Sequence, residues 1–272
     1  MGLLLNSGIE VNAGLHLRGK IARIGGRMNQ LMDYRNCRVT DINIPDGGYG
    51  KVRLGLTLKS LKNTFFTLRR QIRQELSWIL KGEREIRDRK TIILDMHFAM
   101  LNSTLENRFD ASVSSNVIEH SPNPVWLLLN FYFITKKEGY QYHAIPHYRF
   151  IFDQFREPTP TSHFFEDFEK FTWFGDTTHN EDYIMSAIEK HGWQKTFHEK
   201  YPVAYPYMHF HVFDEYNLRE LADTMFEEVK VDILKTDKFN DNLLFFRNRL
   251  KPSFEQRYFT RIEAYKQFVM RK

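Results

Sequence analysis

Cysteine is almost absent from this chain of 272 residues, which contains a single one, Cys37. One thiol cannot form a disulfide within the chain, and it cannot build a zinc site from several cysteines. This scarcity fits a reducing compartment, so we predict a cytoplasmic protein.

Long apolar segments are also lacking. WLLLNFYFI at residues 126–134 is too short to span a bilayer and is typical of a buried helix. MGLLLNSGIEVNAG at residues 1–14 has neither the basic region nor the small-residue cleavage site of a signal peptide. Repeats and low-complexity tracts are missing too. We therefore expect a globular protein without a membrane span.

The excess of one charge over the other is small. Lys and Arg number 39 and Asp and Glu number 34, which gives a net charge of +5. This balance suits an anionic small molecule such as a nucleotide. Because acidic residues are interspersed with the basic ones, we predict no nucleic-acid partner.

Apolar side chains are plentiful, at 42% of the chain, and strand patterns alternate with helical patterns along it. Strands are predicted to start at residues 19, 37, 91, 109, 139, 228 and 242, and helices to cover residues 52–87, 121–137 and 217–226. This alternation predicts an α/β fold with a doubly wound, mostly parallel, Rossmann-like sheet and a closing antiparallel strand.

The alternation breaks between Tyr148 and Pro206, a segment rich in aromatic residues, histidine, aspartate and proline. We predict one domain over residues 1–272, in which residues 148–206 are inserted as a cap over the substrate.

Glycines and polar residues follow five of the predicted strands. They are Gly25 and Gly26, Asp41, Asp95, the group Asn116, Glu119 and His120, and finally His143 and His147. Ligands of doubly wound sheets bind outside the carboxyl ends of the strands, so these residues should border one cleft. Each has a structural alternative, such as a tight turn, a cap or a packed histidine, but their joint placement favours a ligand site.

NVIEH at residues 116–120, preceded by FD at residues 109–110, is similar to the fourth-strand motif "vlEH" of class I S-adenosylmethionine-dependent methyltransferases, in particular the type 11-like group. KKEGYQYHAIPH at residues 136–147 and HFHVFDEYNLRELADTMFEEVKV at residues 209–231 resemble later segments of that group. The resemblance covers most of the chain from Gly19 to Arg249 and implies S-adenosylmethionine as the cofactor.

The resemblance also implies a role for each strand end. Gly25 and Gly26 in the loop RIGGR would approach the methionine part, Asp41 would accept hydrogen bonds from the ribose, Asp95 and Met96 would contact the adenine, and Ser115 and Asn116 would line the sulfonium side. The loop departs from the family at Arg23, where an acid is usual, and at Arg27 and Asn29, which replace glycines.

Methyl transfer to a hydroxyl requires an aligned acceptor and removal of its proton. A histidine suits that base role near neutral pH. The candidates are His120, His143 and His147, with His120 favoured, and the alternative is that these rings only shape turns.

FDQFREPTP at residues 152–160 resembles the family's "D..R..T" segment, so Asp153 and Arg156 could fix a polar acceptor or, equally, brace the cap. His209 and His211 lie two positions apart in a predicted extended segment, so both should point to one face, and we expect His211 to face the acceptor. With Asp214 they could bind a divalent metal, but ligands so close in sequence seldom complete a site, so we predict none.

By resemblance, we predict O-methylation of a sugar or sugar nucleotide in surface polysaccharide biosynthesis. One alternative is a nucleic-acid methyltransferase that uses the basic residues between Lys51 and Arg89. Another is a catalytically inactive scaffold with a methyltransferase fold, which the altered glycine loop favours and the retained polar strand ends oppose. The sequence leaves a homo-oligomer open.

Overall fold

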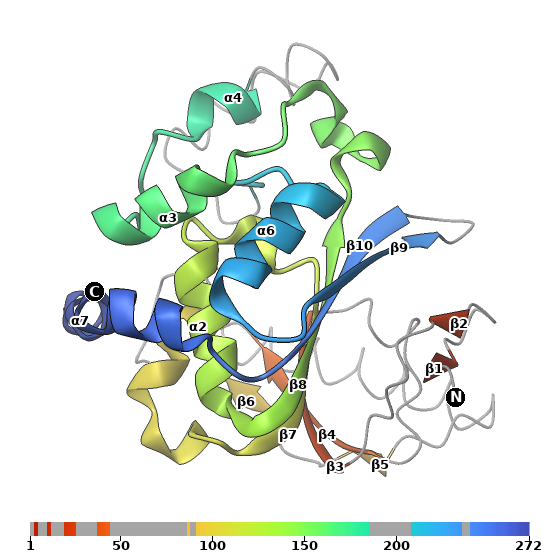
Figure 1. The fold of residues 1–272 in the computed structure, drawn as a ribbon, viewed down its shortest axis with the longest axis vertical. Helices are drawn as coiled ribbons and strands as arrows, with labels where there is room; N and C mark the ends of the chain where they lie inside the picture. Colours follow the sequence, from red (N-terminus) through yellow and green to blue (C-terminus); the bar gives the residue numbers. More distant parts are fainter. Residues whose placement is uncertain are drawn as a thin grey trace, which may run out of the picture.

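The structure, a computed structural model, describes residues 3–4, 10–11, 19–25, 37–43, 86–87, 91–184, 208–235 and 240–271 (Figure 1). Gly26, most of the helix predicted for residues 52–87, and residues 185–206 of the predicted cap lie outside the described residues.

The central sheet has the strand order β5-β4-β3-β7-β8-β10-β9, which confirms the predicted fold class. Its strands are β3 (Gly19–Ile24), β4 (Cys37–Asn43), β5 (Ile86–Arg87), β7 (Phe109–Ser115), β8 (Thr135–Pro146), β9 (Lys230–Lys235) and β10 (Asn240–Arg247), and β6 (Ile92–Ile93) also pairs with β4. β5 and β6 run parallel to β4 at successive places along it, so they act as one interrupted edge strand. β10 is antiparallel to both of its neighbours, as the predicted closing strand requires.

The strand order reverses at β3, because β4 lies on one side of it and β7 on the other. In doubly wound sheets such a reversal opens a crevice at the carboxyl ends of the two central strands. The chain therefore places the ends of β3 and β7 where a ligand would bind. A separate antiparallel pair is formed by β1 (Leu3–Leu4) and β2 (Glu10–Val11).

Helices α2 (Pro124–Ile134) and α6 (Glu215–Met225) cover one face of the sheet, and α7 (Pro252–Val269) lies beside α2 (Figure 1). Helices α3 (Thr161–Lys170) and α4 (Asn180–Ile184) lie beyond the carboxyl end of β8. The described residues also contain short 3-10 helices: η2 (Met96–Leu101), η3 (Ser103–Leu105), η4 (Ile118–His120), η5 (Tyr148–Phe150) and η6 (Phe152–Phe155). No helix of the described ranges combines the length and the apolar character needed to cross a membrane.

Helix α2 is the buried element around which this face is packed. Pro124 starts the helix at a position where a missing N–H costs little, and the side chain of Asn123 caps it by accepting the N–H of Trp126 at 2.9 Å. Its residues are apolar on every side, as expected for a helix enclosed by the sheet, η2, α3 and α7. The Trp126 indole N–H donates to the His97 carbonyl at 2.9 Å, so the one polar atom of that ring is satisfied.

Three predicted elements differ from the structure. The helix predicted for residues 52–87 does not reach its expected end, because Ile86 and Arg87 pair with β4 as strand β5. The third strand was expected over residues 91–98, but it ends at Ile93, because the Asp95 side chain accepts the N–H of His97 and starts η2. The helix predicted to reach Lys137 ends at Ile134, and β8 begins at Thr135 with no loop between them. Thr135 pairs there with Phe109, and the register then shifts before Ala111.

Helix α7 follows the part of the chain that the methyltransferase resemblance covers, and it was not among the predicted elements. Its apolar residues recur every three or four positions and pack onto α2 and α3, ending with Tyr265 and Val269. Tyr265 stacks on Trp126 with ring centroids 4.4 Å apart, and its hydroxyl donates to the Thr172 carbonyl at 2.8 Å. The last helix therefore closes the core.

We expect Tyr265→Ala to lower the free energy of unfolding by about 3–5 kcal/mol, as for other large buried aromatic residues. Tyr265→Phe keeps the stacking and should cost about 1–3 kcal/mol, because the hydroxyl loses its hydrogen bonds with the Thr172 carbonyl and with Asn123 Nδ2. Phe259→Ala, on the same helix but 60% exposed, is the control and should change little. Equal losses for Tyr265→Ala and Phe259→Ala in urea denaturation would contradict the packing described.

Candidate functional site

The ends of β3 and β7 touch at Gly25. This glycine has a φ of +84°, and a Cβ built on it would lie 2.2 Å from the carbonyl oxygen of Ser115. Asn116 follows with a φ of +54°, and its N–H donates to the Ala144 carbonyl of β8 at 3.0 Å. Three neighbouring strand ends are thus joined at the edge where the sequence predicted a ligand.

Asp41, predicted to bind the ribose, forms an ion pair with Arg23 of the adjacent strand. The Arg23 Nε and Asp41 Oδ1 atoms are 2.7 Å apart, and the two residues are register partners in the β3–β4 ladder. Arg23 is buried, whereas the Asp41 side chain is 25% exposed. The arginine that replaces the family's usual acid is therefore the counter-ion of the carboxylate beside it, and a ribose would have to share that carboxylate.

Asp95 and Met96, predicted to contact the adenine, are buried in the core. Asp95 Oδ1 accepts the His97 N–H at 3.0 Å and lies 2.7 Å from His97 Nδ1. His97 Nε2 lies 2.8 Å from the Ser121 hydroxyl. This placement gives Asp95 a capping and histidine-orienting role, and it does not support contact with adenine.

Glu119 is a buried acid just beyond the carboxyl end of β7. Among the residues that the structure describes, neither of its carboxylate oxygens has a hydrogen-bond partner. Burial raises the pKa of Glu119 to about 7, although the charge of His209 opposes the shift. A carboxyl group that titrates near neutral pH is the kind of group that catalytic sites use.

Two imidazoles lie against this acid. His120 Nε2 is 3.7 Å from Glu119 Oε1, and the rings of His120 and His209 have centroids 4.8 Å apart. His120 Nδ1 lies 3.1 Å from the Met208 carbonyl, which only accepts hydrogen bonds. In the neutral ring Nδ1 therefore carries the proton, and Nε2 is the nitrogen that lies 3.7 Å from Glu119. Its side chain is 14% exposed, more than that of Glu119.

Asp153 and Arg156 hold the third member of this group in place. His209 Nδ1 lies 2.6 Å from Asp153 Oδ2, while Arg156 Nη1 donates to Asp153 Oδ1 at 2.9 Å and to the His209 carbonyl at 2.8 Å. Burial raises the pKa of Asp153, but hydrogen bonds and charges from His209 and Arg156 outweigh it and lower the pKa below the usual value. These contacts agree with the alternative in which Asp153 and Arg156 brace the cap and do not fix an acceptor.

The other two predicted bases are placed differently. His143 is buried within the sheet, where Nδ1 lies 2.7 Å from the Ser114 hydroxyl and Nε2 lies 3.1 Å from Gln141 Oε1. Burial lowers its pKa to about 3, so it stays neutral. His147 Nε2 lies 2.9 Å from Glu215 Oε2 at the start of α6. Neither placement supports a base role for these rings, and His120 is the candidate that borders the acid.

His211 does not share a face with His209, contrary to the prediction. Its Nε2 lies 2.8 Å from Asp167 Oδ2 on α3, and its Nδ1 lies 3.1 Å from the Ser121 carbonyl. Asp214, the third ligand considered for a metal, caps α6 instead. The residues from 208 to 211 are not in a strand, so strict alternation does not apply to them.

Glu119 was predicted to be a strand-end residue without a role of its own. The sequence signal for it is a charged residue shortly after an apolar strand. His209 was considered only as a metal ligand beside His211. Its pairing with His120 depends on a contact across 89 positions, which no local pattern shows.

No protein-family model and no curated protein matches the chain. A SAM-dependent methyltransferase structure from Methanosarcina mazei shares 12% identity over 87% of this chain and 95% of its own, with a TM-score of 0.43. The CurJ carbon methyltransferase and the trans-methyltransferase CalH in complex with SAH each share 13% identity, over 85% and 84% of this chain, with TM-scores of 0.42 and 0.40. The match covers 49% and 50% of those two structures, so this chain spans about half their length.

We expect Gly25→Ala to destabilise the protein by at least about 2 kcal/mol, because an added Cβ meets both a positive φ and the Ser115 carbonyl. Gly175→Ala is the matched control. Gly175 also has a positive φ, but a Cβ there has nothing within 4 Å. The difference between the two variants in urea denaturation measures the close approach of β3 and β7, and equal losses would rule it out.

We expect Glu119→Gln to stabilise the protein relative to the native chain as the pH rises from 4.5 to 8. The unfolded chain ionises near the ordinary pKa of 4.5, whereas the folded chain keeps its proton until about pH 7. The native protein therefore loses stability across this window, and by pH 8 the loss is roughly 3 kcal/mol. Glutamine does not ionise, so it removes the loss.

Denaturation curves at several pH values, with exposed Glu106→Gln as the control, test this expectation. A constant difference between Glu119→Gln and the native protein across the window would show that Glu119 titrates like an exposed acid.

Proposed function

We propose that this chain binds S-adenosylmethionine at the carboxyl ends of β3, β4 and β7 and transfers its methyl group to a hydroxyl of a small polar acceptor. The observation that carries the proposal is the place of the motif residues. Gly25, Asp41 and Asn116 come from separate parts of the sequence, and each lies at the carboxyl end of a neighbouring strand at the switch point of the sheet.

The residues at this edge fit the cofactor in part. Gly25 has no Cβ to meet the Ser115 carbonyl, so the ends of β3 and β7 can lie close together where the cofactor would bind. Asp41 offers a partly exposed carboxylate for ribose hydroxyls, although Arg23 already binds its Oδ1. When bound, the cofactor would supply the activated methyl carbon. The chain would supply alignment and proton removal.

Proton removal falls to His120 in this proposal. The Met208 carbonyl fixes the tautomer, so Nε2 can accept the acceptor's hydroxyl proton. Glu119 lies 3.7 Å from that nitrogen and, when ionised, would stabilise the imidazolium that forms. Asp153 and Arg156 act as positioning residues, since they fix His209 beside His120.

The acceptor class follows from the resemblance alone. A sugar or sugar nucleotide of surface polysaccharide biosynthesis remains the acceptor that we propose. A buried acid and two imidazoles around one point suit a hydroxyl acceptor, because its proton must leave during transfer.

A catalytically inactive scaffold is the second candidate, and the Arg23–Asp41 ion pair favours it. A carboxylate held at 2.7 Å by a buried arginine has one oxygen fewer to offer a ribose. If the pair is too strong to share, the chain has kept the sheet and lost the cofactor.

Calorimetric titration with S-adenosylmethionine and S-adenosylhomocysteine separates the two candidates. We expect micromolar binding that Asp41→Asn weakens by about tenfold to a hundredfold, the effect of losing a charged hydrogen bond. Asp110→Asn is the matched control, because Asp110 is also a strand acid but lies at the opposite, amino end of β7. Absence of binding to either ligand by the folded native protein would favour the scaffold.

A further inference from the structure

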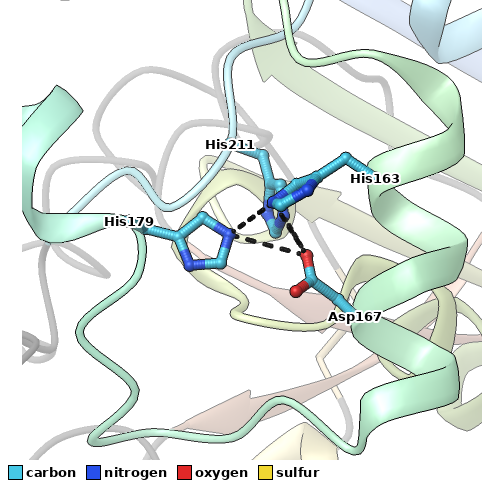
Figure 2. Close-up of side chains that lie close together, drawn as sticks. All are labelled: His163, Asp167, His179 and His211. Carbon is cyan, nitrogen blue, oxygen red and sulfur yellow. Dashed lines mark hydrogen bonds and ion pairs between the residues drawn. The ribbon is translucent and has the colours of Figure 1, made fainter.

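A second cluster of polar side chains lies outside the strand edge, where the inserted segment meets the rest of the chain (Figure 2). His163 and Asp167 stand one turn apart on α3 and so share a face of that helix. His179 comes just before α4, and His211 comes from the segment that leads to α6. Figure 2 shows the four side chains converging on one point.

The facing atoms have the spacing of metal ligands. Asp167 Oδ2 lies 2.8 Å from His211 Nε2 and 3.5 Å from both His163 Nε2 and His179 Nε2. The two last nitrogens are 3.0 Å apart, and all four atoms lie within 4.8 Å of one another. Ligands of a tetrahedral zinc ion at ordinary bond lengths are separated by about 3.4 Å. A small shift of these side chains would enclose an ion.

The hydrogen bonds around the cluster leave ligand atoms facing inward. His211 Nδ1 lies 3.1 Å from the Ser121 carbonyl, so this nitrogen donates and Nε2 of the neutral ring presents a lone pair to the Asp167 carboxylate. Two acceptors at 2.8 Å repel each other unless a cation or an added proton lies between them. A histidine that donates its other N–H to a carbonyl is the usual arrangement of a metal ligand.

Outer contacts orient two other ligands as well. Asp167 Oδ1 accepts a hydrogen bond from the Thr172 hydroxyl at 2.8 Å, which leaves Oδ2 to face the imidazoles. His179 Nδ1 lies 3.2 Å from the Thr178 hydroxyl, which directs its Nε2 inward. Such supporting contacts hold ligands in place before an ion arrives.

We propose that His163, Asp167, His179 and His211 bind one divalent transition-metal ion, with zinc the expected ion. Three imidazoles and one carboxylate suit zinc, whereas calcium and magnesium prefer oxygen ligands. Four protein ligands fill a tetrahedral shell, so the site would be structural. It would tie α3 and the turn before α4 to the segment that carries His209. The proposal does not rest on methyl transfer.

An ion can reach this site from solvent. Three of the ligand side chains are buried, but His163 is 37% exposed. His163 and Asp167 also line a surface hollow of about 500 Å³. The site therefore has an entry path, as a metal site requires.

Another cluster with metal ligands, Glu119, His120 and His209, is a weaker candidate. It offers three ligand groups instead of four, and Nδ1 of His209 already forms a hydrogen bond with Asp153. We therefore assign the ion to the cluster on α3 and test the choice directly.

The test measures metal content by inductively coupled plasma mass spectrometry on full-length protein made without a polyhistidine tag. After dialysis against zinc and then metal-free buffer, we expect about one equivalent of zinc per chain. His179→Ala and Asp167→Asn should lose most of it, and Glu166→Gln should keep it. Glu166 is the neighbouring carboxylate of the same helix, paired with Lys170 at the surface.

Two further measurements guard against variants that do not fold. The circular dichroism of each variant is recorded, and the native protein is stripped with a chelator and titrated with cobalt. Tetrahedral cobalt gives strong visible absorption, which we expect for the native chain and Glu166→Gln only. The Tm of the stripped protein should rise when zinc is restored.

Three results would overturn the proposal: a native protein that binds no metal under these conditions, equal metal content in Glu166→Gln and a folded His179→Ala, or loss of the ion in His120→Ala instead. Stoichiometric iron, manganese or nickel that depends on His179 would support the site and replace zinc as its ion.

Discussion

The turn between β7 and α2 is the constraint on which the rest of the described structure depends. A chain that leaves one buried strand and enters a buried helix must satisfy its polar groups internally. Asn123 does so for three helices at once, since its Oδ1 caps α2 while its Nδ2 donates to the Asp167 carbonyl of α3 and to the Tyr265 hydroxyl of α7. Ser121, two residues earlier, bonds to His97 through its hydroxyl and to His211 through its carbonyl.

The same turn connects the two sites that we propose. Glu119 and His120 lie just beyond the carboxyl end of β7, whereas the next residue, Ser121, fixes the tautomer of His211 in the metal cluster. The segment 208–211 runs between them, with the Glu119 carbonyl bonded to the N–H of Phe210. An ion on His211 would therefore restrain the backbone that supplies His209 and the Met208 carbonyl to the strand edge. Cofactor chemistry and metal binding would remain separate properties linked by one short segment.

Sequence reasoning predicted the parts of the fold whose signal is local. The apolar runs of β3, β4 and β7 and the periodic residues of α6 lie where the patterns indicated, because β3 and β7 are buried almost throughout and α6 buries one face. The prediction of the third strand was wrong beyond Ile93. The Asp95 side chain accepts the N–H of His97, and this hydrogen bond competes with pairing to the neighbouring strand. In the cluster on α3, the spacing of His163 and Asp167 was the only local signal. His179 and His211 join them through tertiary packing, which no single-sequence pattern reveals.

The role of Arg23 in the glycine-loop motif becomes clear only together with the residue beside it in the sheet. In the sequence it looks like the loss of an acid, but in the sheet it is the register partner of Asp41 and pairs with it. Buried carboxylates elsewhere follow the same rule: Asp153 has its arginine and histidine, and its pKa is lowered. Glu119 lies equally deep, its nearest imidazole is beyond hydrogen-bond distance, and its pKa is raised. A fold that pairs Asp41 and Asp153 and leaves the Glu119 carboxylate without a hydrogen bond from the described residues maintains an unfavourable charge beyond the end of β7, which is why we place the proton-handling chemistry at Glu119 and His120.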